Sequence, residues 1–189
     1  MGCGLAGILG LAMLIPFVLR IARTAAGRPP ADQARYLPGI PSPSKDAVPW
    51  PTCDGSAKTL VGVSPAWRSA EDFEAALREQ DATGAPLLIY VRTDWCRYCA
   101  AFDRVLSDQR LNEYLARQVV KVRINPENGA AAARLSALLG VEGYPSLFLI
   151  SPLRAVSEVS WRESPVEFLV ELQQFTQWQI DHACWAKGD

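Results

Sequence analysis

The hydrophobic positions of this chain fall into two regions separated by a stretch that is rich in proline. Gly2–Leu19 is apolar and uncharged, whereas the chain from about Leu60 onward alternates short apolar runs with amphipathic segments. Between them, Gly27–Pro51 carries repeated prolines and no hydrophobic periodicity. The pattern predicts four parts: an apolar N-terminal segment (residues 1–26), a Pro-rich linker (27–58), one folded domain (59–181) and a tail (182–189).

The apolar runs of the folded part predict its strands. Pro86–Val91 is continuously apolar, which is typical of a strand covered on both faces. Val119–Ile124 is rich in β-branched residues and alternates, which also favours a strand. The other strand candidates are Leu60–Val63, Ser146–Ile150 and Ala155–Ser160.

Helices are predicted between these strands, and residues that favour helix ends mark several of them. Ser69 stands three residues before Asp72, a carboxylate variant of the capping box. Gly140 ends an apolar helix face that begins near Ala131, and Ser164-Pro165 offers an N-cap followed by a proline at the first helical position. Two further helices are expected, after Cys99 towards Leu106 and over Asp108–Gln118.

The resulting order, β-α-β-α-β-α-β-β-α, predicts an α/β fold. Its central mixed sheet should be parallel at first and close with a hairpin, with helices on both faces. Composition agrees with one such domain, because a chain of 189 residues that is 49% hydrophobic can bury one sizeable core but hardly two. The net charge is −1 and the basic residues are scattered, so a nucleic-acid partner is not expected.

The apolar N-terminal segment is long enough to cross a membrane. Gly2–Leu19 supplies about 18 residues for a hydrocarbon core of roughly 30 Å. A cleaved signal peptide, with Thr24–Ala26 as its cleavage site, is the alternative. A cleaved signal normally has a basic residue before its apolar run, and this chain has none there. We therefore favour an uncleaved anchor.

The side of the membrane on which the domain lies is indicated by two signals that disagree. Arg20, Arg23 and Arg28 follow the span and favour the cytoplasm under the positive-inside tendency. The use of cysteine suits an oxidising compartment instead. We give more weight to the cysteine usage and expect a membrane-anchored protein whose domain faces the periplasm.

Two of the five cysteines form a close pair, and their setting favours redox chemistry. Cys96 and Cys99 follow a predicted buried strand and open a predicted helix. The unpaired N–H groups and dipole of a helix N-terminus favour a thiolate, and the positive charge of Arg97 should lower the pKa of Cys96 further. Cys99 lies one helical turn on, where it can resolve a mixed disulfide. We predict Cys96 as nucleophile and Cys99 as resolving thiol.

Two other interpretations of the pair are less favoured by the sequence. A zinc site is disfavoured because the chain has no second CxxC or CxxH, and its one histidine, His182, matches no usual zinc spacing. A purely structural disulfide would close so short a loop that its benefit is slight. We therefore expect no metal and no cofactor beyond the redox-active disulfide. Cys53 and Cys184 are candidates for a structural disulfide across the whole domain, although sequence cannot fix connectivity.

Two motifs resemble the thioredoxin superfamily. They are Asp94–Cys99 (DWCRYC) and, far downstream, Gly143–Ser146 (GYPS). The likeness is closest to the C-terminal thioredoxin-like domain of bacterial thiol:disulfide interchange reductases. The resemblance implies a thioredoxin-like fold in which Pro145 is a cis-proline facing the cysteines, Tyr144 gives backbone hydrogen bonds to a bound substrate chain, and Trp95 forms part of the docking surface.

The sequence departs from that family at two points. Many relatives carry a buried aspartate six residues before the first cysteine, whereas this chain has Tyr90 there. Proton transfer would then use water or another acid, for which Glu71, Asp94 and Asp103 are candidates. The Arg-Tyr dipeptide between the cysteines matches neither the reducing nor the strongly oxidising relatives, so the redox direction stays open.

These observations predict a membrane-tethered thiol:disulfide oxidoreductase that exchanges disulfides with extracytoplasmic proteins. Its expected partners are protein thiols and disulfides, with a membrane electron-transfer protein as a candidate second partner. Two alternatives remain: a thioredoxin-fold binding or scaffold protein without turnover, and a reductant that faces the cytoplasm.

Overall fold

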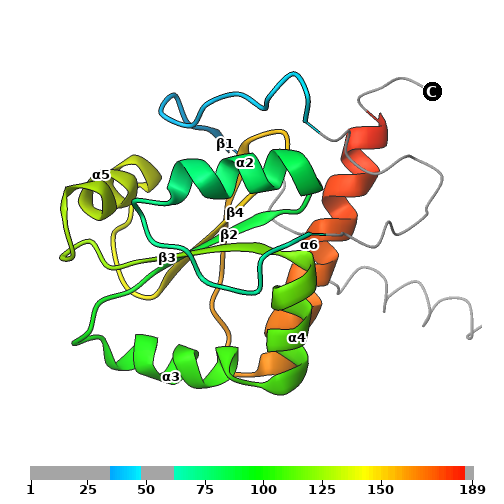
Figure 1. Ribbon diagram of the computed structural model, residues 1–189. Coiled ribbons are helices and arrows are strands. Elements are labelled where there is room, and N and C mark those ends of the chain that lie inside the picture. Colours follow the sequence, from blue (N-terminus) through cyan, green and yellow to red (C-terminus); the bar gives the residue numbers. More distant parts are fainter. Residues whose placement is uncertain (1–34, 48–61, 186–189) are drawn as a thin grey trace, which may run out of the picture.

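A five-stranded mixed sheet lies at the centre of the computed structural model, which describes residues 35–47 and 62–185 (Figure 1). The strands follow the spatial order β1-β5-β4-β2-β3. β2 and β3 run parallel, and the other neighbouring pairs are antiparallel. The predicted α/β fold with a mixed sheet is confirmed. The strands are β1 (Arg35–Tyr36), β2 (Leu87–Val91), β3 (Val120–Ile124), β4 (Ser146–Ile150) and β5 (Ala155–Val159).

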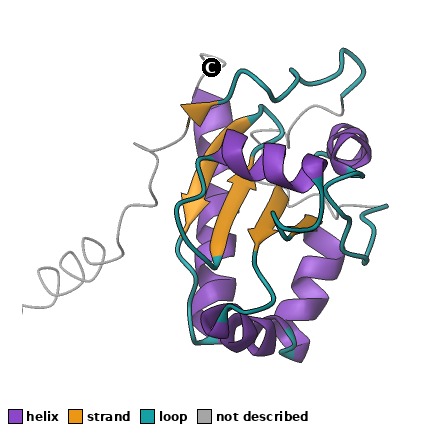
Figure 2. Cartoon of the chain, turned by 90° about the vertical axis from the view of Figure 1, so that its left-hand side faces the viewer, coloured by secondary structure: helices purple, strands orange, loops and turns teal. Residues whose placement is uncertain are grey.

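Helices cover both faces of this sheet (Figures 1 and 2). α2 (Phe73–Thr83) and α5 (Ala130–Leu139) pack on one face, where they share a hydrophobic core with the strands. The opposite face carries a second core with three helices: α3 (Arg97–Leu106), α4 (Gln109–Gln118) and α6 (Pro165–Trp185). The sheet is therefore the middle layer of three.

Strand β2 connects the two cores. All five of its residues are buried, as the continuous apolar run predicted. Alternation sends Leu87, Ile89 and Val91 into the core with α2 and α5, whereas Leu88 and Tyr90 enter the core with α3, α4 and α6. The strand is held on both sides by β3 and β4, so its end is a fixed point in the molecule.

Two predicted element boundaries were wrong. The strand expected at Leu60–Val63 does not extend over Gly62 and Val63, and the nearest sheet contact is an isolated parallel bridge between Arg68 and Val122. The helix expected from Ser69 begins at Phe73, because the Ser69 hydroxyl donates to the Asp72 carboxylate, 3.0 Å away, instead of capping a helix. α6 runs from Pro165 to Trp185 and so continues past residue 181, where the predicted domain ends.

Part of the predicted linker belongs to the folded unit. β1 pairs antiparallel with β5, and Ile40 is buried in the core with α2 and α5. The buried Arg154 fastens this segment, since its Nε donates to the carbonyl of Pro41 over 3.1 Å and its guanidinium pairs with Asp81 at 2.6 Å. The segment thereby covers the edge of β5.

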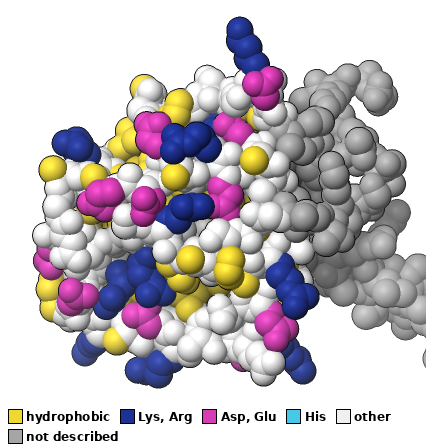
Figure 3. All heavy atoms as spheres, in the orientation of Figure 1, with side chains coloured by type: hydrophobic (Ala, Val, Ile, Leu, Met, Phe, Trp, Pro, Cys, Tyr) yellow, Lys and Arg dark blue, Asp and Glu magenta, His cyan; other side chains and the backbone are white. Residues whose placement is uncertain are grey.

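The surface is mixed in charge on the face shown in Figure 3, where positive and negative side chains are interspersed. In the part of the chain that the structure describes, no helix is both long enough and apolar enough to span a membrane. The anchor predicted for residues 1–26 lies outside the described residues.

Lys121 is an unusual member of the core. Its side chain is 1% exposed, and its ammonium group donates to the carbonyl oxygens of Ser64, Leu115 and Val119 over 3.1, 3.0 and 3.2 Å. Burial lowers the pKa of Lys121 to about 8, and the charge of Glu79 only partly opposes this shift. The folded state therefore binds the lysine proton less tightly than the unfolded chain does.

This difference predicts a pH-dependent stability. Between about 8 and the ordinary Lys value of 10.5 the unfolded chain binds more protons, so the free energy of unfolding should rise with pH across that window. The rise should total roughly 3 kcal/mol and then level off. Urea unfolding from pH 7 to pH 11 measures it, with Lys121→Met as the comparison. An equal slope in both proteins would assign the effect to other groups.

Candidate active site

The cysteine pair lies where the buried strand β2 passes into helix α3. β2 ends at Val91, and Cys96 is the N-cap of α3, with extended backbone torsion angles. The Cys96 N–H donates to the carbonyl of Thr93 over 3.4 Å, which turns the connecting loop towards the helix. The pair is thus fixed to the rigid end of a central strand.

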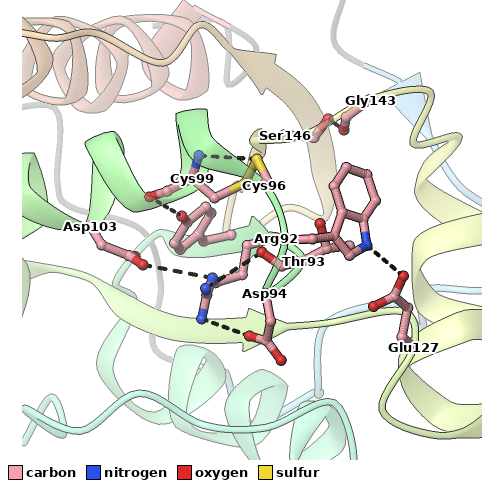
Figure 4. The surroundings of a disulfide bond; sticks show 11 residues. Arg92, Thr93, Asp94, Cys96, Cys99, Asp103, Glu127, Gly143 and Ser146 are labelled. Atoms are coloured by element: carbon pink, nitrogen blue, oxygen red, sulfur yellow. Dashed lines mark hydrogen bonds and ion pairs between the residues drawn. A yellow bond between two sulfur atoms is a disulfide. The ribbon is translucent and has the colours of Figure 1, made fainter.

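Cys96 and Cys99 form a disulfide, with Cα atoms 5.2 Å apart (Figure 4). The backbone N–H of Cys99 donates to the Cys96 sulfur over 3.0 Å, so this sulfur caps the helix. Cys96 is 5% exposed and Cys99 is completely buried. Of the two sulfur-bearing residues, Cys96 is the one that an outside molecule can approach.

The Gly143–Ser146 turn lies beside the cysteines. Ser146, the first residue of β4, pairs with Val91, the last residue of β2, so the turn meets the strand end that leads to Cys96. The Tyr144–Pro145 peptide bond is cis, as the resemblance implied. The Ser146 hydroxyl closes the turn by donating to the carbonyl of Gly143 over 2.7 Å.

Aromatic side chains stand on either side of Cys96. Trp95 is 69% exposed, and its ring lies edge-on to Tyr144 with centroids 5.8 Å apart. On the other side, Tyr98 lies 6.0 Å from the ring of Trp161. The Arg97 guanidinium lies over the Tyr98 ring at 4.7 Å and also donates to its hydroxyl over 2.7 Å.

An open hollow of about 430 Å³ lies between these walls. Its lining combines apolar rings with one positive and one negative side chain, and it includes the more accessible cysteine. Such a surface can accept an extended segment of another chain that brings a disulfide to Cys96. The lining residues are Trp95, Cys96, Arg97, Tyr98, Glu142, Gly143 and Tyr144.

Tyr90 occupies the place of the missing acid. It is completely buried, its ring packs edge-on against Phe102, and its hydroxyl donates to the carbonyl of Cys99 over 3.2 Å. Burial raises the pKa of Tyr90, and the neighbouring charge of Asp103 raises it further, against the opposing charges of Arg92 and Arg123. Tyr90 is therefore a neutral hydrogen-bond donor and cannot accept a proton at physiological pH.

A cluster of charged groups lies next to Tyr90. Asp103, one turn after Cys99 on α3, is 3.7 Å from Arg92 Nε and 3.9 Å from an Nη of Arg123. These separations suit a bridging water better than a direct hydrogen bond. Four buried polar atoms here have no hydrogen-bond partner within the described protein: Arg92 Nε, Thr93 Oγ1, Asp103 Oδ1 and Arg123 Nε.

The other candidate acids lie differently. Asp94 is 73% exposed and pairs with Arg92 at 3.4 Å, and Glu71 is on the surface. Of the three, Asp103 is the carboxylate that acts on Tyr90, whose hydroxyl contacts the Cys99 carbonyl. Figure 4 shows Asp103 on the Arg92 side of this group.

Most of the predicted site residues come together. Cys96, Trp95, Arg97 and Tyr144 line one hollow, with Cys99 beneath it and cis-Pro145 next to Tyr144. The Arg97 guanidinium is directed at Tyr98, so its effect on Cys96 stays a prediction.

The second predicted cysteine pairing stays untested. Cys53 lies outside the described residues, and of Cys184 only the backbone, within α6, is described. Within the described ranges no group of three or more metal-binding side chains converges.

The sequence did not point to Glu127 or Trp161. The Trp95 indole N–H donates to Glu127 over 2.8 Å, a contact that joins residues 32 positions apart. Trp161 reaches Tyr98 from the segment between β5 and α6. No local pattern signals either contact, because both depend on how the loops meet at the end of the sheet.

Comparison with known proteins agrees with this geometry. Residues 66–152 match the family model described as thioredoxin-like. The chain thus carries a thioredoxin-like domain with a CxxC pair. This arrangement is that of thiol:disulfide oxidoreductases as a broad class. No curated protein sequence matches the chain.

Among solved structures, the oxidised C-terminal domain of DsbD from Neisseria meningitidis is 17% identical, with 58% of this chain and 98% of that chain covered and a TM-score of 0.50. A structure described as DsbH oxidoreductase is 15% identical, with 62% and 88% covered and a TM-score of 0.50. A thioredoxin from Thermus thermophilus is 27% identical, with 58% and 86% covered and a TM-score of 0.47. At 17% and 15% identity, the similarity to the first two structures supports the fold alone.

Proposed function

We propose that this protein is a membrane-tethered thiol:disulfide oxidoreductase that exchanges disulfides with extracytoplasmic proteins. One observation carries the proposal: Cys96 caps a helix, joins a buried Cys99 in a disulfide, and faces a cis-proline turn across an open hollow. An accessible sulfur, a buried partner sulfur and a docking surface are the parts that two-step exchange needs.

In the first step, the Cys96 thiolate of the reduced protein attacks one sulfur of a substrate disulfide. The Cys96–substrate bond forms, the substrate S–S bond breaks, and the leaving thiolate takes up a proton from solvent. The Cys99 N–H, which donates to the Cys96 sulfur, and the positive end of the α3 dipole stabilise the attacking thiolate. Arg97 is the proposed additional source of positive charge.

In the second step, Cys99 loses its proton and attacks the Cys96 sulfur of the mixed disulfide. The Cys96–Cys99 bond forms, and the second substrate thiolate leaves, so the substrate gains two electrons and the pair loses two. The same steps in reverse oxidise a substrate dithiol, and the reduction potential of the pair sets the direction. Trp95, Tyr144 and Pro145 are the proposed docking residues for the substrate chain.

The buried thiol of Cys99 needs a proton acceptor, and we assign this part to Asp103. Tyr90 cannot serve, since its hydroxyl is a neutral donor to the Cys99 carbonyl. Asp103 lies one helical turn after Cys99, and its buried Oδ1 faces Arg123 at 3.9 Å without a hydrogen-bond partner among the described residues. A water held between Asp103 and Arg92 would pass the proton outward.

The cellular placement is proposed from sequence. The Gly2–Leu19 run has the length of one span, and the cysteine usage suits an oxidising compartment. A protein so tethered would meet disulfides of extracytoplasmic proteins. A membrane electron-transfer protein could restore the redox state of its cysteine pair.

Trapping tests the function and the placement together. Cys99→Ser should stop after the first step and accumulate mixed disulfides through Cys96, whereas Cys99→Ser combined with Cys96→Ser should accumulate none. Cys96→Ser and Cys99→Ser should each reduce insulin at least about 100-fold more slowly than the wild type, because each loses a sulfur of the exchange.

Non-reducing gels and mass spectrometry of membrane fractions identify the trapped partners. Extracytoplasmic partners that sediment with membranes are the expected result. Cytoplasmic partners would contradict the proposed orientation, and an absence of mixed disulfides would favour a binding protein without turnover.

The part assigned to Asp103 predicts a selective defect. Asp103→Asn keeps the shape of the side chain but removes the proton acceptor, so the second step should slow about 100-fold or more while the first step keeps its rate. Single-turnover decay of the mixed disulfide measures this, with Asp94→Asn as the control for charge near Arg92. Equal decay rates in Asp103→Asn and the wild type would rule Asp103 out.

A further inference from the structure

Within the part of the chain that the structure describes, the exposed side chain of Trp95 makes one polar contact. Although the side chain is 69% exposed, its indole N–H donates to the Glu127 carboxylate over 2.8 Å (Figure 4). A hydrogen bond to a carboxylate is stronger than one between neutral groups, and it selects one orientation of a ring that could otherwise turn in solvent.

The same ring forms one wall of the hollow. Trp95 meets Tyr144 edge-on at 5.8 Å, and Tyr144 precedes cis-Pro145 and contacts both cores. Trp95 thus spans the distance between the Glu127 loop, which precedes α5, and the Tyr144 turn, which follows α5. A change in the orientation of this ring alters the surface beside Cys96.

Glu127 is itself held in place by its turn. Its backbone N–H donates to the Asn125 side-chain oxygen over 3.0 Å, and the Asn125 amide donates to Asp94 over 3.4 Å. Asp94 and Trp95 are adjacent, so the turn binds two successive residues of the loop that carries Cys96. The contacts form a closed circuit through Asp94, Asn125, Glu127 and Trp95.

We infer that Glu127 is a positioning residue for substrate docking, acting through the indole of Trp95. This inference rests on the proposed function. Glu127 does not line the hollow, and its contact with Trp95 lies on the indole N–H rather than at the sulfur. Its loss should therefore weaken the docking of a polypeptide disulfide without changing the reactivity of Cys96.

The test compares Glu127→Ala with Glu127→Gln, whose amide oxygen can still accept the indole hydrogen bond. Asn128→Ala, an exposed change in the same turn, is the matched control. KM and kcat are measured for a peptide disulfide and for hydroxyethyl disulfide, which is too small to need the wall. The indole N–H resonance of Trp95 is followed by nuclear magnetic resonance.

Glu127→Ala should raise KM for the peptide disulfide about two- to tenfold, the range of one hydrogen bond, with kcat unchanged. Hydroxyethyl disulfide should be reduced at the wild-type rate. Glu127→Gln and Asn128→Ala should stay within about twofold of the wild type, and only Glu127→Ala should shift the Trp95 resonance to that of a free indole.

Three results would overturn the inference: an unchanged peptide KM in Glu127→Ala, an equal loss on both substrates, or a Glu127→Gln protein as impaired as Glu127→Ala. A wild-type protein that reduces neither disulfide would instead refute the proposed function. The Trp95 resonance would then still show whether Glu127 orients the ring.

Discussion

The hydrogen bond from the Cys99 N–H to the Cys96 sulfur is the interaction around which the site is built. It makes Cys96 the cap of α3, and it places a positive backbone dipole against the sulfur that is to carry negative charge. The bond can form only where the chain leaves β2 at a defined point. The five buried residues of β2, held by strands on both sides and helices on both faces, provide that point.

The rest of the site follows from the neighbours of β2. Its antiparallel pairing with β4 brings the cis-proline turn beside the cysteines. Its parallel pairing with β3 places Arg123 opposite Tyr90, where the guanidinium lies over the tyrosine ring at 5.5 Å. Tyr90 stands in the place of a buried acid, and Asp103 on α3 is the carboxylate that acts on it. We propose that Asp103 supplies the acid of this site from a different element.

Local sequence signals predicted the parts of the fold that depend on neighbouring residues. The apolar run of β2, the Gly140 helix end and Pro165 at the start of α6 were all confirmed, and the two cysteines of the CxxC spacing form a disulfide. The features that the sequence did not predict depend on tertiary contacts. β1 has two residues and forms because β5 offers a free edge, and Lys121 is buried because carbonyls surround it. Glu127 had no signal either, since its contact with Trp95 depends on two loops meeting.

The reactivity of the two thiols tests the central claim most directly. In the reduced protein, iodoacetamide alkylation of each cysteine is followed by mass spectrometry from pH 4 to pH 10. The account predicts that Cys96 reacts first while Cys99 stays protected. The pH at which the Cys96 rate is half-maximal should lie well below the ordinary thiol pKa of about 8.5. Equal alkylation of both cysteines, each with a midpoint near that ordinary value, would contradict it.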